Sequence, residues 1–457
     1  MNFNQINKVY FIGIGGIGMS ALARYFHSQG RAVSGYDKTE TVLTKQLVEE
    51  GISIHYDDTG RDVLDHYGRI DTLVVYTPAI PAEMEELKTF QEYNYTVIKR
   101  AKALGIVSNE METYAVAGTH GKTTTSTILA HVLNCTTDKV NAFIGGIASN
   151  YNSNCIINPG SQRVVVEADE FDRSFLELQP NYSIITSMDA DHLDIYGDGE
   201  HMQTSFNDFI NLSKAYGVLM INSNIDLSNF DISTSLRINT YGIDDNPDWR
   251  LHALRYTDGK FFFDIISHSK IFRNIEFGLP GQHNAENATA VFALCFELGI
   301  DEEDIRSAFK TFKGVKRRFD FKVRKEDMVV IDDYAHHPTE IDAFLRSVKK
   351  LYPKKKITAV FQPHLFSRTR DFMDEFANSL ATADELYLLP IYPAREKPIE
   401  GITSEALLEE VNMYEKQISS LSTIVDDLSQ SEHEVICIIG AGDIDTTVQP
   451  ITDHYSK

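Results

Sequence analysis

The chain reads Val116-Ala117-Gly118-Thr119-His120-Gly121-Lys122-Thr123-Thr124-Thr125 at the point that decides its fold. An apolar segment precedes the glycines, and residues with helical spacing follow from Ile128 onward. The order of strand, glycine turn and helix start surrounds an anion with backbone N–H groups and the positive end of a helix. In such a loop Lys122 can reach terminal phosphates, and the Thr123 hydroxyl can bind Mg²⁺. The stretch therefore predicts a nucleotide-binding α/β domain. The alternative is a plain turn rich in glycine and threonine, because Val116 stands where the usual motif has its first glycine.

Length and composition limit the class of protein. A chain of 457 residues is too long for one ordinary domain, and its length suggests about three. A net charge of −23 argues against general nucleic-acid binding, because the chain and the phosphates repel each other. The four cysteines are scattered without a C-x-x-C pair, which argues against a zinc site or a disulfide framework. No basic leader and no long apolar run is present, so we expect a cytoplasmic protein without a membrane segment.

Residues 1–109 are predicted to form a first α/β domain, with strands at 8–14, 32–35 and 71–76 and a helix at 19–27. The first strand leads into a G-x-G-x-x-G pattern, and an aspartate follows the second strand about twenty residues later, as in dinucleotide-binding folds. The glycines could instead only allow close packing of helix on strand, or could bind a nucleotide diphosphate other than NAD. The candidate diphosphate-binding residues are Gly13, Gly15, Gly16, Ile17, Gly18 and Asp37.

Residues 110–317 are predicted to form a central domain with two acidic strand ends. The strand at 163–167 leads into residues 167–170, and the strand at 182–186 leads into residues 189–194. Parallel strands end on one edge of a sheet, so both clusters should lie beside the phosphate loop. Mg²⁺ prefers carboxylates, phosphate oxygens and water, so we predict that Glu167 binds Mg²⁺ and that His192 binds a second metal ion. A solvated surface is the alternative for Glu167, and a hydrogen-bonded core residue for His192.

Short strands are predicted over residues 251–266, broken at residues 258–259, and a helix over 288–298. The helix is preceded by a polar segment that contains His283, Asn284 and Asn287. Asparagine at a helix start is an ordinary cap. The functional alternative places these three side chains against a nucleotide base.

Residues 318–457 are predicted to form a third α/β domain, with strands at 329–331, 357–361, 385–389 and 435–439. His364, Arg368 and Arg370 follow the second of these strands. They make a cationic cluster suited to a carboxylate or a phosphate. Basic residues on an exposed helix are the alternative.

Two phosphate loops in separate α/β units suggest two nucleotide-containing ligands. One loop has the features of a Mg²⁺–ATP site, so the chain is predicted to use ATP on a second molecule that carries a diphosphate. Phosphoryl transfer needs positioning and charge neutralisation, which Lys122, Mg²⁺ and an arginine such as Arg317 could supply.

The whole chain resembles the Mur ligases of bacterial peptidoglycan synthesis, and above all their alanine-adding branch. Thr119 and His120 between the two glycines are the family's form of the phosphate loop, which accounts for the missing first glycine. The matching segments follow in order along nearly the full length: 13–20, 118–124, 167–172, 189–194, 283–287, 332–340, 360–370 and 392–401.

The resemblance implies a fold and a reaction. It implies a UDP-sugar domain, a central ATPase domain and a C-terminal Rossmann-like domain. ATP would phosphorylate the lactyl carboxylate of UDP-N-acetylmuramate, and the amino group of L-alanine would attack the acyl phosphate. The product would enter cell-wall synthesis, and the enzyme would be a monomer or a weak homodimer.

The resemblance also implies roles for individual residues. Thr123 and Glu167 would bind the first Mg²⁺ and His192 the second. The ATP-binding residues would be Gly118, Thr119, His120, Gly121, Lys122, Thr123, Thr124, His283, Asn284, Asn287 and Asp333. The catalytic residues would be Lys122, His192, Arg317, His364, Arg368 and Arg370, of which the last three would face the alanine carboxylate and the acyl phosphate.

One departure from the sister ligases concerns lysine. Those enzymes carry a carbamylated lysine downstream of the second acidic cluster, whereas this chain has no lysine between His192 and Lys214. We therefore expect no lysine carbamate. Three rival functions stay open: a recycling ligase that joins a whole peptide to UDP-N-acetylmuramate, an NAD-dependent oxidoreductase, and an ATP-binding protein without catalysis.

Overall fold

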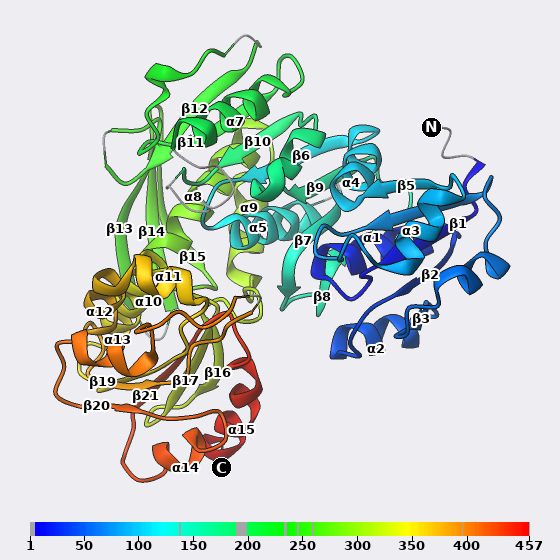
Figure 1. The fold of residues 1–457 in the computed structure, drawn as a ribbon. Helices are drawn as coiled ribbons and strands as arrows, with labels where there is room; N and C mark the ends of the chain where they lie inside the picture. Colours follow the sequence, from blue (N-terminus) through cyan, green and yellow to red (C-terminus); the bar gives the residue numbers. More distant parts are fainter. Residues whose placement is uncertain are drawn as a thin grey trace. The chain divides into compact units, whose positions relative to one another are not determined.

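The computed structural model describes residues 5–136, 139–188, 199–232, 235–244, 246–257, 260–394 and 396–456. Its strands form sheets of five, ten and six strands (Figure 1). Contacts divide the chain into two compact units. The first comprises residues 1–253, 263–276 and 286–313, and the second comprises residues 254–262, 277–285 and 314–457. Among the helices of the described ranges, none is both long enough and apolar enough to cross a membrane.

Parallel strands form the first sheet, in the order β3-β2-β1-β4-β5. They are β1 (Lys8–Ile12), β2 (Ala32–Tyr36), β3 (Ser53–His55), β4 (Thr72–Tyr76) and β5 (Thr96–Lys99). The helices are α1 (Ile17–Ser28), α2 (Val42–Glu49), α3 (Glu85–Glu92) and α4 (Arg100–Asn109), with a 3₁₀ helix η2 (Gly60–His66). The three predicted strands are confirmed, although β1 ends before Gly13. Sequence reasoning missed β3 and β5 because both are short and only half-buried, so neither contains an apolar run.

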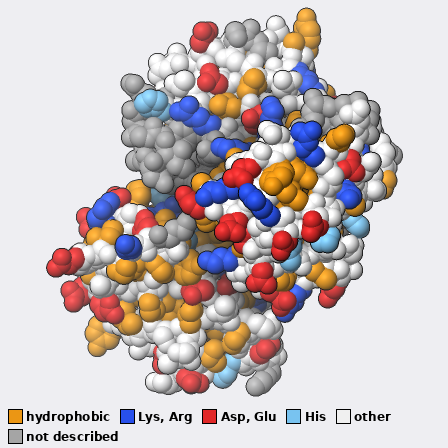
Figure 2. All heavy atoms as spheres, turned by 45° about the vertical axis from the view of Figure 1, so that its right-hand side comes forward, with side chains coloured by type: hydrophobic (Ala, Val, Ile, Leu, Met, Phe, Trp, Pro, Cys, Tyr) orange, Lys and Arg blue, Asp and Glu red, His pale blue; other side chains and the backbone are white. Residues whose placement is uncertain are grey.

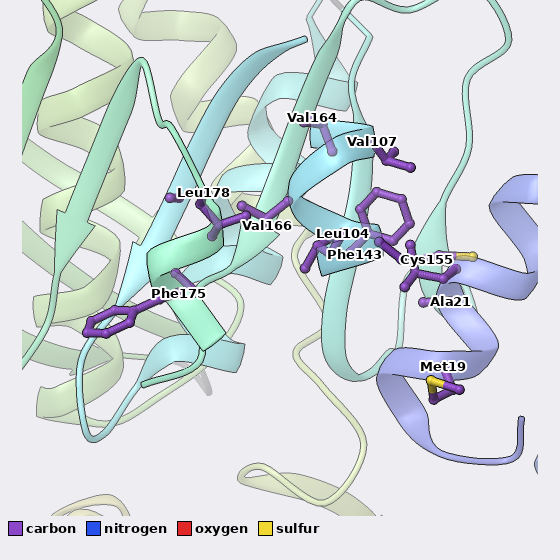
Figure 3. Close-up of a cluster of buried hydrophobic side chains, with 14 of the residues drawn as sticks. Met19, Ala21, Leu104, Val107, Phe143, Cys155, Val164, Val166, Phe175 and Leu178 are labelled. Atoms are coloured by element: carbon purple, nitrogen blue, oxygen red, sulfur yellow. The ribbon is translucent and has the colours of Figure 1, made fainter. Parts of the chain in front are cut away.

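One hydrophobic core joins the first sheet to the second (Figure 3). It includes Ala21 from α1 and Leu104 from α4, together with Phe143 and Val166 from strands of the second sheet. These side chains are at most 7% exposed. Burial of apolar surface, at roughly 25 cal/mol per Å², therefore holds the two layers together within one compact unit.

The second sheet has the order β15-β14-β13-β12-β11-β10-β6-β9-β7-β8. Neighbours from β13 to β7 in this order run parallel, and β8 runs antiparallel to β7. Its strands are β6 (Glu112–Ala117), β7 (Asn141–Ala148), β8 (Ser153–Ile156), β9 (Arg163–Glu167), β10 (Tyr182–Ile185), β11 (Val218–Asn222), β12 (Arg237–Gly242), β13 (Trp249–Thr257), β14 (Lys260–Ser267) and β15 (Ile271–Phe277). Its helices are α5 (Lys122–Cys135), α7 (Gly199–Asn211), α8 (Gln282–Glu297) and α9 (Glu302–Thr311), with the 3₁₀ helices η3 (Phe171–Glu177) and η4 (Leu227–Asn229). The strand predicted at 163–167 coincides with β9.

The third sheet has the order β16-β17-β21-β18-β19-β20, in which only β16 is antiparallel to its neighbour. Its strands are β16 (Asp320–Arg324), β17 (Val329–Asp333), β18 (Ile357–Phe361), β19 (Glu385–Leu388), β20 (Lys416–Ile418) and β21 (Val435–Ile439). Its helices are α10 (Pro338–Leu351), α11 (Phe366–Asp371), α12 (Met373–Leu380), α13 (Ser404–Glu410), α14 (Ile424–Leu428) and α15 (Asp445–Tyr455). The predicted strands at 357–361 and 435–439 coincide with β18 and β21, both fully buried.

Acidic and basic side chains are both spread over the face of the molecule drawn in Figure 2, and several Lys and Arg side chains lie next to one another near its centre. They do not separate there into one large basic field, which agrees with the acidic net charge of −23.

Candidate active site

The nucleotide loop, residues 118–124, connects β6 to α5 as the sequence predicts. Gly118 and Gly121 have φ angles of +133° and +79°, which L side chains rarely adopt. A Cβ on Gly118 would lie 2.1 Å from Oγ1 of Thr186, so no larger residue could occupy that position. Gly121 is the N-cap of α5, and Lys122 is the first residue of that helix. The loop therefore directs the positive end of a helix at any anion that it holds.

Residues after β10 brace this loop from one side. The Ser187 hydroxyl accepts a hydrogen bond from the backbone N–H of His120 at 2.9 Å, and the Ser187 carbonyl accepts one from the N–H of Thr119 at 3.2 Å. The Thr186 hydroxyl donates to the carbonyl of His120 at 2.5 Å. Hydrogen bonds with Thr186 and Ser187 thus hold both the N–H and the carbonyl of His120 in place.

A buried ion pair holds the loop lysine. Nζ of Lys122 lies 2.8 Å from the carboxylate of Glu170, and it also donates to the carbonyl of Gly118 at 2.6 Å. The side chains of Lys122 and Glu170 are 13% and 0% exposed. Burial alone would lower the pKa of Lys122, but Glu170, Asp169 and other acidic neighbours outweigh it and raise that pKa. The lysine is therefore a fixed cation in the loop.

Two side chains that can bind a metal ion through oxygen lie together at the start of α5. Oγ1 of Thr123 donates to Oε1 of Glu167 at 2.9 Å, and the N–H of Gly145 donates to the other Glu167 oxygen at 2.8 Å. A hydroxyl of the nucleotide loop beside a carboxylate is a set of oxygen ligands that suits Mg²⁺. The structure thus brings together the predicted ligands Thr123 and Glu167. The third predicted ligand, His192, lies outside the described residues.

The start of α8 contributes one side chain to the nucleotide loop. A Cβ on Gly121 would lie 3.1 Å from Oδ1 of Asn287, so this buried amide lies against the loop. Asn284 instead donates from Nδ2 to the carbonyl of Pro280 at 2.7 Å, as a side chain that holds the helix start. His283 is half-buried, and desolvation of its ring lowers its pKa to about 4, so the ring is neutral at pH 7.

The glycine loop, residues 13–18, is closed by Asp37. Oδ2 of Asp37 accepts a hydrogen bond from the N–H of Gly15 at 2.7 Å, and a Cβ on Gly15 would lie 2.8 Å from the same oxygen. Helix α1 begins at Ile17, directly after the exposed Gly16. The aspartate therefore shapes the loop, while the first turn of α1 presents its N–H groups to a ligand.

Arg317 and two aspartates meet at the ends of β17 and β21. Arg317 donates from Nη2 to the carbonyl of Gly440 at 2.6 Å, and its Nε lies 3.8 Å from Oδ1 of Asp332. The carboxylate of Asp333 accepts the N–H groups of Phe319 and Ala335 at 2.7 and 2.8 Å. Burial raises the pKa of Asp332 to about 7 and that of Asp333 to about 6. Arg317 also has a φ of +61°, so tertiary contacts hold it in a strained conformation.

The predicted cationic cluster after β18 is only partly assembled. His364 stacks on Tyr392 with ring centres 5.6 Å apart, and its ring lies 6.1 Å from that of His336. Burial, His336 and Arg368 together lower the pKa of His364 to about 4. Arg368 therefore lies close enough to His364 to lower its pKa. Arg370 is instead exposed and pairs with Asp371 at 2.7 Å.

Several residues at these sites were not predicted from the sequence. The sequence places Glu170 only within the acidic run at residues 167–170, and Thr186 and Ser187 only at the end of a predicted strand. Their position directly after β9 and β10 is the signal that could have identified them, because these strands flank β6 in the sheet. Arg100 was missed for the same reason, because it directly follows the unpredicted β5.

Comparisons with known proteins cover the whole chain. Family models match in three segments: the Mur ligase family catalytic domain at residues 8–111, the Mur ligase middle domain at 116–295 and the Mur ligase glutamate ligase domain at 317–442. A UDP-N-acetylmuramate–L-alanine ligase from Flavobacterium psychrophilum is 49% identical over 457 residues, with 100% of both chains covered. Another from Flavobacterium johnsoniae is 47% identical, with 99% of this chain and 98% of the relative covered.

Solved structures show the same fold. The crystal structure of a UDP-N-acetylmuramate–alanine ligase from Thermotoga maritima superposes with a TM-score of 0.82 at 29% identity, covering 98% of this chain and 99% of that one. A murein peptide ligase from Psychrobacter arcticus superposes with a TM-score of 0.69 at 22% identity, covering 98% of each chain. The second likeness concerns the fold alone.

Proposed function

The chain belongs to the Mur ligase family, and from that premise we propose that it joins L-alanine to UDP-N-acetylmuramate with conversion of ATP to ADP and phosphate. Whole-length relatives with 47% and 49% identity carry that activity in their names. The observation that carries the proposal in the structure is the nucleotide loop, where a buried lysine and a threonine–glutamate oxygen pair lie within one helix turn. That arrangement serves phosphoryl transfer and has no part in hydride transfer.

The reaction divides into two displacements. A lactyl carboxylate oxygen attacks the γ-phosphorus of ATP, the bond from that phosphorus to the β–γ bridging oxygen breaks, and ADP leaves. The amino nitrogen of L-alanine then attacks the acyl carbon, inorganic phosphate leaves, and the nitrogen loses a proton to solvent or a nearby base. An amide bond has formed, and one ATP has been consumed.

Residues of the central domain neutralise the phosphates. Lys122 binds the β- and γ-phosphate oxygens from the first turn of α5, where its charge is held by Glu170. Thr123 and Glu167 would hold Mg²⁺ through their oxygens. When bound, Mg²⁺ supplies charge neutralisation at the phosphate oxygens. His192 is proposed as a ligand of a second ion.

The remaining roles follow the family's motifs. Three side chains at the start of α8 are proposed to contact the adenine: those of His283, Asn284 and Asn287. Asp333 is proposed to contact the ribose. Arg317 is proposed to neutralise the γ-phosphate. The side chains proposed to receive the alanine carboxylate and the acyl phosphate are those of His364, Arg368 and Arg370. His364 is neutral at pH 7, because its pKa is about 4, so Arg368 carries the charge of this group.

Domain assignment and setting belong to the same proposal. Residues 1–109 bind the UDP-sugar through Gly13, Gly15, Gly16, Ile17, Gly18 and Asp37. Residues 110–317 bind ATP, and residues 318–457 form the C-terminal ligase domain. The enzyme acts in the cytoplasm on precursors of peptidoglycan, as a monomer or weak homodimer, without a nucleic-acid or membrane partner.

A coupled assay tests the function. Purified protein with ATP, Mg²⁺, UDP-N-acetylmuramate and L-alanine should release phosphate and form the UDP-N-acetylmuramoyl-alanine amide, detected by mass. Phosphate release should require L-alanine, and the tripeptide substrate of a recycling ligase should not replace it. The Lys122→Ala variant should form no product, which excludes a contaminating ligase. Absence of amide with the wild-type protein would refute the proposal, and preference for the tripeptide would favour the recycling reaction.

A further inference from the structure

Arg100 lies between the glycine loop and the nucleotide loop but belongs to neither of them. Arg100 is the first residue of α4 and directly follows β5. In the first sheet Ile12 of β1 pairs with Tyr76 of β4, which in turn pairs with Lys99 of β5. The last residues of these strands are therefore level, and Arg100 emerges at the sheet edge where the glycine loop begins.

The guanidinium of Arg100 lies against the first turn of α1. A Cβ on Gly18 would lie 2.9 Å from Nη1 and 3.2 Å from Cδ of Arg100, so the missing side chain of this glycine makes room for the arginine. The N-terminus of a helix carries partial positive charge and favours anions. A cation held at that point is electrostatically unfavourable unless an anion joins it.

Arg100 forms a long ion pair with a carboxylate that follows β9. Nη2 of Arg100 lies 3.5 Å from Oδ2 of Asp169, and the two side chains are 22% and 39% exposed. A part-exposed pair at this distance contributes little to stability, so a ligand can displace it. Asp169 follows β9 and precedes Glu170, the partner of Lys122. Two ion pairs, Arg100–Asp169 and Lys122–Glu170, thus lead from the glycine loop to the nucleotide loop, and their two carboxylates are neighbours in sequence.

We propose that Arg100 binds an anionic oxygen of the UDP-sugar, in exchange for Asp169, and so positions this substrate relative to the nucleotide loop. The inference rests on the proposed function, because it takes the UDP-sugar as the ligand of the glycine loop. Two groups of that substrate have the required chemistry: the diphosphate, which the first turn of α1 also attracts, and the lactyl carboxylate that receives the phosphoryl group. Either would complete the charge arrangement that Asp169 now satisfies only loosely.

Binding measurements on the full chain test this role. Isothermal titration with UDP-N-acetylmuramate should show affinity reduced about tenfold to a hundredfold in Arg100→Ala, the usual effect of losing a charge-assisted hydrogen bond. Arg100→Lys should recover part of that loss. Lys102→Ala is the matched control, because Lys102 is on the same helix and pairs across to Glu177 at 2.9 Å without touching the glycine loop. Its affinity should stay within about threefold of wild type.

Two further measurements separate the possible results. UDP-N-acetylglucosamine has the diphosphate but no lactyl carboxylate. Equal loss of affinity for both sugars assigns Arg100 to the diphosphate, and loss confined to UDP-N-acetylmuramate assigns it to the carboxylate. In kinetics, the KM for UDP-N-acetylmuramate should rise while the KM for ATP stays unchanged, which a general loss of structure would not produce.

The inference is overturned if Arg100→Ala binds UDP-N-acetylmuramate within threefold of the wild-type affinity. If that variant does not fold, judged by its thermal transition, Arg100→Gln keeps the polar side chain and carries the same test. Failure of the wild-type protein to bind UDP-N-acetylmuramate would instead refute the proposed function, so the two failures are distinguishable.

Discussion

Nζ of Lys122 and the carboxylate of Glu170 lie 2.8 Å apart, with the glutamate completely buried and the lysine 13% exposed. Lys122 is the residue on which the phosphate loop depends, and Glu170 is a partner that sequence motifs did not single out. A buried pair of this kind is costly to break, because removal of one member leaves the other charge without compensation. The pair therefore keeps the loop cation fixed and charged before nucleotide binds.

Removal of Glu170 should destabilise the protein through Lys122. Glu170→Gln should lower the free energy of unfolding by about 3 kcal/mol, and the double variant with Lys122→Met should cost less than the sum of the single changes. A double-mutant cycle by chemical denaturation measures the coupling. The exposed pair Lys102–Glu177 is the control, since its side chains are 54% and 38% exposed, and its coupling should stay below about 1 kcal/mol. Equal couplings for the two pairs would contradict this account.

The nucleotide loop should not accept a side chain at Gly118. Gly118→Ala combines a φ of +133° with a Cβ 2.1 Å from Oγ1 of Thr186, so we expect a loss of stability above about 3 kcal/mol. Gly160→Ala is the comparison, because its φ is +84° but nothing lies within 4 Å of the added Cβ. That change should cost only about 1–2 kcal/mol. Thermal unfolding of both variants decides, and similar melting temperatures would show that the loop can relax.

The Thr123 hydroxyl should be needed for Mg²⁺ rather than for folding. Thr123→Val removes the oxygen that lies 2.9 Å from Glu167, so the Mg²⁺ concentration for half-maximal activity should rise at least about tenfold. Thr123→Ser retains the hydroxyl and should remain close to wild type. A magnesium titration at saturating ATP makes the comparison. An unchanged Mg²⁺ requirement in Thr123→Val would remove this residue from the proposed metal site.

His364 should make the protein less stable in acid. Its pKa falls from 6.5 to about 4 on folding, through burial, His336 and Arg368. The folded state therefore binds fewer protons than the unfolded state between these values, and stability falls as pH drops from 6.5 towards 4. The cost is at most about 3 kcal/mol at pH 4. His364→Gln should lose this part of the pH dependence, measured as the difference in unfolding free energy between the two proteins at several pH values. A constant difference would show that the histidine titrates normally.

Local sequence was sufficient for the parts of the fold that depend on nearest neighbours. Strands rich in apolar residues were predicted at the observed bounds of β9, β18 and β21, because strands buried on both faces need such residues. The glycine spacing predicted both loops, because residues such as Gly118 must adopt a conformation that other residues avoid. Strand-end position was also sufficient to predict that Glu167 lies beside Thr123, since parallel strands end on a common edge.

Tertiary structure decided what depends on contacts between distant segments. The pairing of Lys122 with Glu170 joins residues whose neighbours in sequence give no sign of a buried charge, and only the packing around them excludes water. The same holds for Arg100, which meets Gly18 of one loop and Asp169 of another domain. It also holds for Arg370, which its position after the strand at 357–361 grouped with His364 but which is exposed and pairs with Asp371. Residue type and backbone conformation thus determined where the two loops lie in the sequence and which shape they take. Burial is a property of the folded chain, and it decided which charged residues form ion pairs with the loops.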